Sequence, residues 1–311
     1  MLQILADGLI IGSVVALGAI GLSLTLTIFR FSNFAHGELL AWGAYLALVA
    51  MVAVAQVHAL LPALMGPMGT MGPFSFGPGM LLALLLSAVG TAGIALLLDM
   101  LLFKRLRRQG SITLVIASFG AALALRNLLQ FWQGGVPKYY VETLQIAINI
   151  LPRSVAGGLR ATADQLLVLV LAVCVVAALH LFLRYSTLGR AMRATATNPA
   201  LAQVSGIDPE QVLRATWVLG AVLAAVAGVM AAITVQLRPT MGQDLLLPMF
   251  AAVILGGIGS VWGAVVGGLV VGLAESAAVM WVGAEYRAAA AFAVLIVILL
   301  IRPTGLFGEK D

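Results

Sequence analysis

Three polar side chains that could relay protons or contact a polar solute stand together between two long apolar runs. Asn33, His36 and Glu38 lie in the stretch FSNFAHGELLAWGAY at residues 31–45. If the flanking runs cross a membrane, ionisable groups at membrane depth would indicate a proton relay or a polar pathway. The alternative, which we favour, places the three residues at the membrane interface, where they cap the second apolar run.

A second stretch that could line a solute path is the glycine-rich segment LGGIGSVWGAVVGGLVVGLAES at residues 255–276. Small residues at every fourth position let two helix backbones approach closely, and this is the interpretation we favour. Glycine-interrupted segments can also expose backbone groups to a substrate path. The repeats are Gly259, Gly263 and Gly267, then Gly268 and Gly272, with Gly8 and Gly12 in the first run; the path candidates are Gly256, Gly257, Gly259 and Gly263.

Three charged residues lie inside apolar runs. Asp99 is about a turn from Lys104 and can pair with the basic loop that begins there. Arg126 lies in the outer half of its run, and we expect it to snorkel outward. Glu275 needs a charged partner or a water-filled path. It could therefore line a pore or contact another subunit.

The stretch RYSTLGRAMRATATNPALAQVSGIDPEQVLRATW at residues 184–217 predicts a short helix between two apolar runs. Asn198 can cap a helix that Pro199 begins, because proline is tolerated at the first helical position. Gly206 can take the left-handed conformation that closes it, and Asp208 can cap the next helix. The physical pattern fits a rigid docking element and an ordinary structured loop equally well.

The chain lacks the motifs of the common enzyme classes. None of its three lysines follows a glycine, so the phosphate-binding ending Gly-Lys-Ser/Thr is missing. We find no HExxH, no GxSxG and no carboxylates at catalytic spacing, and His58 and His180 have no ligand spacing. The single cysteine, Cys174, excludes an intramolecular disulfide. We therefore expect no catalytic residue, no metal site and no cofactor bound by this chain.

The composition identifies the elements that must position these residues. Of 311 residues, 62% are hydrophobic and only 9% are charged. A soluble domain has roughly 25% charged residues, so soluble enzymes and disordered proteins are excluded. The net charge of +5 comes from basic residues between apolar runs, which excludes a nucleic-acid partner. The sequence predicts an all-α polytopic membrane protein, because long apolar runs without alternation are helices in lipid.

We expect about eight to nine transmembrane helices in a single domain covering residues 1–311. Lys and Arg crowd the loops 104–110 and 184–214, which we therefore place in the cytoplasm, with loops 62–79 and 132–163 outside. The N-terminus is then outside. Arg302 and Lys310 predict a cytoplasmic C-terminus. This last prediction fails if residues 245–258 only dip into the membrane and return to the same side. The predicted spans are 8–29, 39–61, 80–103, 111–131, 164–183 and 215–237, followed by the apolar segments 245–258, 261–282 and 286–301.

Four passages in order resemble the membrane permease of branched-chain amino acid ABC importers. They are FSNFAHGELLAWGAY, RYSTLGRAMRATATNPALAQVSGI, AVILGGIGSVWGAVVGGLVVGLAE and IRPTGLFG, and the similarity is to the H-type subunit of the family. The resemblance implies the type II ABC importer permease fold, in the bacterial inner membrane. It also implies three kinds of partner besides membrane lipid: a second, M-type permease, two ATPase subunits that bind ATP and Mg²⁺, and a periplasmic substrate-binding protein.

The resemblance further implies that the cytoplasmic loop holds the helix that couples the permease to its ATPases. The coupling candidates are Gly189, Arg190, Arg193, Asn198, Pro199, Ala200, Leu201, Val204, Gly206 and Asp208. Permeases for urea, amides and aromatic acids share these motifs and stay open as alternatives. A proton-coupled secondary transporter using His36, Glu38 and Glu275 is a second hypothesis, and an integral membrane enzyme, for which no constellation exists, is a third.

Overall fold

The computed structural model describes residues 1–60, 74–140, 147–151, 159–302 and 304–307. Residues 62–73 of the predicted outer loop, part of loop 132–163, and Lys310 lie outside this range. Each of the nine predicted apolar segments coincides with one helix, and eight helical segments of the described chain are long and apolar enough to cross a membrane. The prediction of an all-α membrane protein is confirmed.

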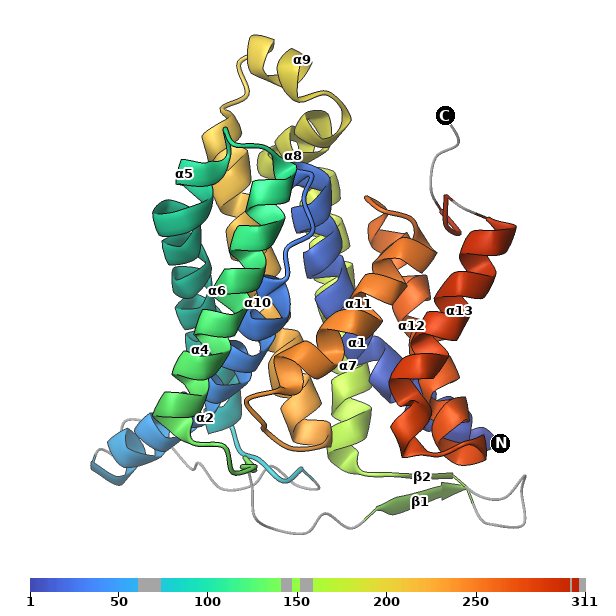
Figure 1. The fold of residues 1–311 in the computed structure, drawn as a ribbon. Coiled ribbons are helices and arrows are strands. Elements are labelled where there is room, and N and C mark those ends of the chain that lie inside the picture. The colour runs from blue at the N-terminus through green and yellow to red at the C-terminus, as the bar shows by residue number, and fades with distance from the viewer. Residues whose placement is uncertain (61–73, 141–146, 152–158, 303, 308–311) are drawn as a thin grey trace.

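The described chain consists mainly of helices that follow one another in sequence (Figure 1). Only one small antiparallel sheet is present in the described residues, between two strands of the segment that joins α6 to α7. The long helices are α1 (Leu2–Phe29), α2 (Ala35–Leu60), α4 (Gly79–Leu98), α6 (Ser111–Gln133), α7 (Ala163–Tyr185), α10 (Pro209–Thr234), α11 (Met241–Gly256), α12 (Val261–Trp281) and α13 (Arg287–Ile301). The short elements are a π-helix (Asp99–Phe103), α5 (Lys104–Leu106), β1 (Ile148–Leu151), β2 (Leu159–Ala161), α8 (Thr187–Thr197), α9 (Pro199–Val204) and a 3-10 turn (Ala284–Tyr286).

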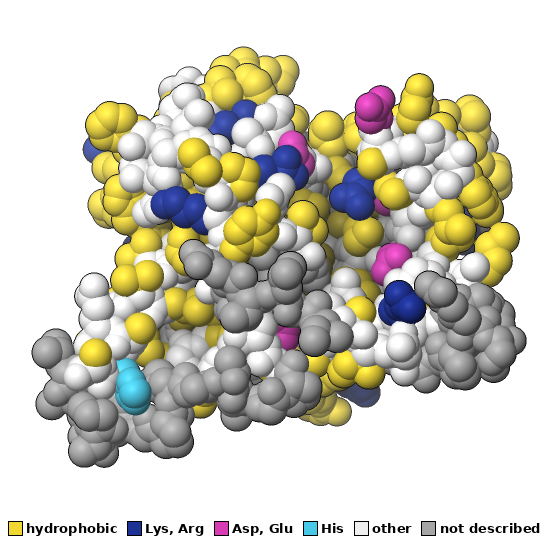
Figure 2. All heavy atoms as spheres, turned by 90° about the horizontal axis from the view of Figure 1, so that it is seen from below, with side chains coloured by type: hydrophobic (Ala, Val, Ile, Leu, Met, Phe, Trp, Pro, Cys, Tyr) yellow, Lys and Arg dark blue, Asp and Glu magenta, His cyan; other side chains and the backbone are white. Residues whose placement is uncertain are grey.

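The two basic loops lie at the same end of the molecule. In Figure 1, α5, α8 and α9 stand at one end together with the last turn of α13, and β1, β2 and the N-terminus stand at the other. Viewed from the N-terminal end (Figure 2), the described acidic and basic side chains are scattered among hydrophobic ones. The positive-inside rule assigns the end with α5, α8 and α9 to the cytoplasm.

Helix α11 carries the chain toward the cytoplasmic end instead of returning it to the outer end. The chain leaves α10 at the outer end, where Leu237 pairs with Lys138 in the segment after α6. Helix α11 ends at Gly256, close to Gly263 at the start of α12. Its 16 residues extend ~24 Å, which is shorter than a full span. The end of α13, which Arg302 follows, therefore lies at the same end as α9, as predicted, and Lys310 lies outside the described residues.

Labelling of introduced cysteines checks this topology. Arg108 and Gly135 are exposed and lie in the segments that follow α5 and α6. In a background where the exposed Cys174 is replaced by alanine, Arg108→Cys should react from the cytoplasmic side of sealed vesicles and Gly135→Cys from the outer side. Reaction of both cysteines from one side would contradict the topology.

The core lies around α1. In the most apolar 18-residue stretch of α1, 78% of the residues are buried. In the last helical segment, Ala284–Ile301, the corresponding share is 6%, so this segment is peripheral. Helix α12 packs on α1 through Gly268 and Gly272, where an added Cβ would overlap the backbone of Ala16 and Gly12. Its other glycines, Gly263 and Gly267, contact α11. The prediction of close packing along the glycine repeats is confirmed.

The segment after α13 returns to the end of α11. The N–H groups of Leu306 and Phe307 donate to the carbonyls of Leu255 and Gly256, at 2.8 and 3.0 Å. Gly305, with φ of 79°, makes the turn and lies against Gly257. These bonds satisfy carbonyls that a helix C-terminus leaves without a partner.

Candidate functional site

Helix α2 begins inside the helix bundle and not at the membrane interface. Arg30 ends α1 in the left-handed conformation, and the chain then turns back so that Phe31 packs on Phe103. The Nε2–H of His36 donates to the carbonyl of Gly18, near the middle of α1, at 3.0 Å. The prediction that this segment lies at the interface is therefore wrong, because aromatic packing draws it inward.

Asn33, His36 and Glu38 are all buried, with exposed fractions of 0%, 0% and 1%. The Asn33 side chain accepts the N–H of Ala35 at 3.1 Å and so caps the first turn of α2. The Asn33 amide nitrogen, His36 Nδ1 and Glu38 Oε2 are buried without a partner in the structure. Since buried polar atoms normally have partners, this cluster retains binding capacity inside the bundle.

Glu38 is the charged centre of this cluster and joins three helices. Arg126 of α6 donates to one carboxylate oxygen of Glu38 through two nitrogens, at 2.7 and 3.1 Å. The same guanidinium also donates to the side-chain oxygen of Gln243 in α11. The expectation that Arg126 snorkels outward is wrong, because a buried carboxylate offers the guanidinium a closer partner.

The first turns of α2 and α11 meet beside this ion pair. A Cβ on Gly37 would overlap the carbonyl of Gly242, and the reverse also holds. The N-termini of α2 and of the short helix α11, which carry partial positive charge, thus lie next to each other within the bundle. In many membrane transporters, helix N-termini within the membrane point at the solute.

An exposed polar strip adjoins the cluster. Asn127 of α6 and Gln243 and Asp244 of α11 are exposed in the isolated chain. Polar side chains at membrane depth face a protein neighbour or water and not lipid. None of the three was among the sequence candidates, because nothing local separates them from interface residues.

The other candidate path residues lie elsewhere. Gly256 and Gly263 form the contact of α11 with α12, and Gly257 and Gly259 turn between these helices with positive φ. The N–H of Gly259 donates to Ser23 of α1 at 3.3 Å. Glu275 is buried in α12, with Arg287 at 3.7 Å. The structure does not gather the three groups that a proton relay through His36, Glu38 and Glu275 would require.

The cytoplasmic segment contains the short helix that its residues predict. The Asn198 side chain accepts the N–H of Leu201 at 3.0 Å, and Pro199 opens α9. Gly206 follows with φ of 86°, and the N–H of Ile207 donates to the carbonyl of Ala202 at 3.0 Å, which completes a Schellman ending. Asp208 caps α10 through the N–H of Glu210. Both helix starts and the glycine ending are confirmed.

Helix α9 presents its apolar residues to the outside. Leu201 and Val204 are 63% and 87% exposed, and Ala200 beside them is also exposed. Only Ala202 of this helix is buried. The preceding helix α8 is held against the end of α7. A Cβ on Gly189 would overlap Leu183, and Arg193 donates to the Leu183 carbonyl. Arg190 of the same helix is exposed.

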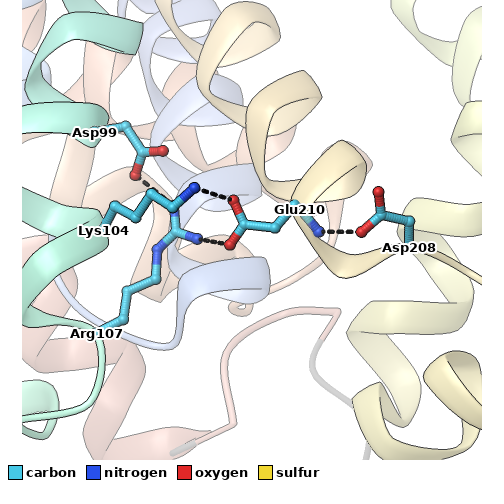
Figure 3. Close-up of polar contacts among 5 residues, drawn as sticks. All are labelled: Asp99, Lys104, Arg107, Asp208 and Glu210. Atoms are coloured by element: carbon cyan, nitrogen blue, oxygen red, sulfur yellow. Dashed lines mark hydrogen bonds and ion pairs between the residues drawn. The ribbon is translucent and has the colours of Figure 1, made fainter.

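An ion cluster connects the two basic loops directly after α9 (Figure 3). Arg107 donates to Asp99 and, at 2.9 Å, to Glu210 in the first turn of α10. Lys104 lies 3.4 Å from the other oxygen of Glu210. The predicted pairing of Asp99 with the basic loop is confirmed, and Asp99 begins the π-helix turn Asp99–Phe103 that joins α4 to α5. Glu210 was not a sequence candidate, because only charge complementarity links it to a loop 103 residues earlier.

The described residues contain no group of three histidine, cysteine or acidic side chains that could hold a metal ion. Two other features of the described chain remain as candidate sites. They are the buried polar cluster at the start of α2, which has polar atoms without partners, and helix α9, whose apolar side chains are exposed.

Comparisons with known proteins agree on one family. The family described as branched-chain amino acid transport system permease component matches residues 4–301. The chain is 33% identical over 311 residues to the high-affinity branched-chain amino acid transport system permease protein BraD of Pseudomonas aeruginosa, covering 100% of this chain and 96% of that protein. It is 30% identical to LivH of Escherichia coli with the same coverage. The probable permease LivH of Methanocaldococcus jannaschii is 27% identical over 317 residues, covering 98% of this chain and 92% of that protein. No solved structure gives a significant match.

Proposed function

The chain belongs to the family of branched-chain amino acid transport permeases, and we propose that it is one membrane subunit of an ATP-driven importer. It is a multi-pass inner membrane protein, and its relatives are transport components. The proposed cargo is a branched-chain or related hydrophobic amino acid, since BraD and LivH carry that substrate class in their names.

The observation that carries this proposal is the exposed apolar face of α9. A capped helix with fixed ends transmits displacement, whereas a flexible loop would dissipate it. Exposed Leu201 and Val204, adjacent on one short helix at the cytoplasmic side, offer an apolar surface that suits a protein partner. Because the chain has no phosphate-binding loop, we assign ATP and Mg²⁺ to two separate ATPase subunits whose surfaces receive α9.

The exposed polar strip supports a second membrane partner. Gln243 and Asp244 are exposed at the start of α11, beside the buried pair of Glu38 and Arg126. In a permease pair, these side chains would face the second subunit or the path between the subunits. A periplasmic binding protein would deliver the amino acid to the outer end of that path.

Replacing Ala200 by arginine tests the proposed coupling. The substitution adds a long charged side chain to the exposed face of α9 without filling any buried space. Leaving that charge unpaired in an interface costs ~3 kcal/mol, which weakens ATPase binding roughly 100-fold. We expect the folded permease to lose co-purification with its ATPases and their transport-linked ATP hydrolysis.

The matched control is Ala194→Arg, the same change at an exposed site on α8. This variant should keep assembly and transport near the level of the unmodified chain. Full assembly and transport in Ala200→Arg would show that α9 is not the coupling helix. A secondary transporter would be insensitive to both substitutions and would work without ATPases.

A further inference from the structure

A cavity at the cytoplasmic boundary is unused by the proposed transport function. Its volume is about 350 Å³, within the range of small-molecule sites. It lies between the last turns of α1 and α7, the helix α8 and the beginning of α12. Its lining includes Leu24, Thr27, Ile28, His180, Leu183, Arg184, Met192, Arg193, Ala196, Gly259 and Val261.

The lining has two chemical parts. Arg184, Arg193 and His180 supply hydrogen-bond donors, and the described lining residues include no Asp or Glu. One nitrogen of Arg193 already donates to the Leu183 carbonyl, which leaves its other N–H groups for a ligand. Leu24, Ile28 and Val261 form apolar walls. An arginine pair is suited to phosphate oxygens, which guanidinium groups bind with paired hydrogen bonds. The apolar walls have no use for a free phosphate ion, but they suit the glycerol backbone and the first methylene groups of an acyl chain.

The position of the cavity also points to lipid. The lining residues of α1, α7 and α12 come from helix ends at one membrane boundary, which is the depth of the phosphate groups. Tyr185 and Trp262, next to lining residues, are 66% and 50% exposed, and the Trp262 ring contacts His180 at 5.2 Å between centroids. Exposed aromatic side chains of this kind are enriched at headgroup level.

We propose that this cavity binds the headgroup of an anionic phospholipid, with Arg184 and Arg193 on the phosphate and the acyl chains along α7. Basic pockets between transmembrane helices on the cytoplasmic side have the chemistry that such headgroups require. A bound lipid would bridge α8 to α1, α7 and α12. Since α8 leads directly into α9, it would hold the proposed coupling segment at the membrane boundary.

Native mass spectrometry of the purified full-length permease tests the proposal. The probes are palmitoyl-oleoyl phosphatidylglycerol and the zwitterionic phosphatidylcholine with the same chains, each titrated alone and with inorganic phosphate as competitor. We expect tight retention of one phosphatidylglycerol and weaker retention of phosphatidylcholine. The double substitution Arg184→Gln and Arg193→Gln should weaken phosphatidylglycerol retention roughly 30-fold, at about 1 kcal/mol per arginine.

Three variants control for folding and for general charge. Arg108→Gln removes an exposed positive charge at the same end but outside the cavity, and should bind phosphatidylglycerol normally. Replacing both arginines by lysine should restore part of the binding, and Ala196→Trp should block it while keeping every charge. Equal retention of the two lipids, or unchanged retention in the Gln double variant, would overturn the proposal. Displacement of phosphatidylglycerol by millimolar inorganic phosphate alone would overturn it in favour of a free-phosphate site.

Discussion

Replacing Glu38 by alanine is expected to destabilise the permease strongly. The Arg126 guanidinium donates two hydrogen bonds to this buried carboxylate, and loss of the carboxylate leaves the positive charge without an anionic partner, with only the neutral Gln243 bonded to it. Removing one member of a buried ion pair costs about 3–5 kcal/mol. We therefore expect little monodisperse protein after extraction and a lower unfolding temperature, measured by size-exclusion chromatography and thermal unfolding.

A second variant separates stability from transport. The double substitution Glu38→Leu and Arg126→Met removes both charges at similar volume, which often restores stability. If the pair also serves the solute path, this double variant should fold and still fail to transport. Glu285→Ala, an exposed acid near the outer end, is the control and should behave as the unmodified chain. A normal folded yield for Glu38→Ala alone would contradict the buried pair.

Gly272→Leu is expected to separate α12 from α1 and prevent correct folding. A Cβ at this position would overlap the backbone of Gly12, which cannot rotate away as a side chain can. Overpacking costs about 1–3 kcal/mol where side chains can adjust, and more where two backbones meet. We expect the expressed chain to aggregate or to be degraded. Fluorescence-detected size-exclusion chromatography measures both outcomes.

The matched control for this substitution is Gly120→Leu. Gly120 lies within α6, and nothing lies within 4 Å of a Cβ added there. Leucine is also a better helix former than glycine, so Gly120→Leu should fold at least as well as the unmodified chain. Similar behaviour of the two leucine variants would show that the close contact of α1 with α12 is not required for folding.

The features that follow from local signals could be predicted from the sequence. The start of α9 depends on Asn198 and Pro199, and its end depends on Gly206, so neighbouring residues determine both. The glycine repeats likewise predict close helix contacts. The repeats do not specify a partner, and α12 uses Gly263 and Gly267 toward α11 but Gly268 and Gly272 toward α1.

The features that depend on distant residues could not be predicted. Packing of Phe31 on Phe103 stabilises the inward turn after α1. Glu38 pairs with Arg126, which lies 88 residues later in the chain. In the hydropathy pattern, Asn33 and Glu38 are polar residues at the edge of an apolar run. The same pattern fits residues at the membrane interface and residues buried in the bundle. Only the packed bundle distinguishes a buried start of α2 from an exposed one.

The contact of residues 305–307 with α11 imposes an order on biosynthesis. Leu255 and Gly256 depend on the N–H groups of Leu306 and Phe307 for their carbonyl partners. Those residues emerge from the ribosome only after α12 and α13, since the chain is made from its N-terminus. The cytoplasmic end of α11 therefore remains incompletely bonded while two further helices insert. A nascent chain arrested before Gly305 would contain all the helices of the described residues yet lack this closing contact.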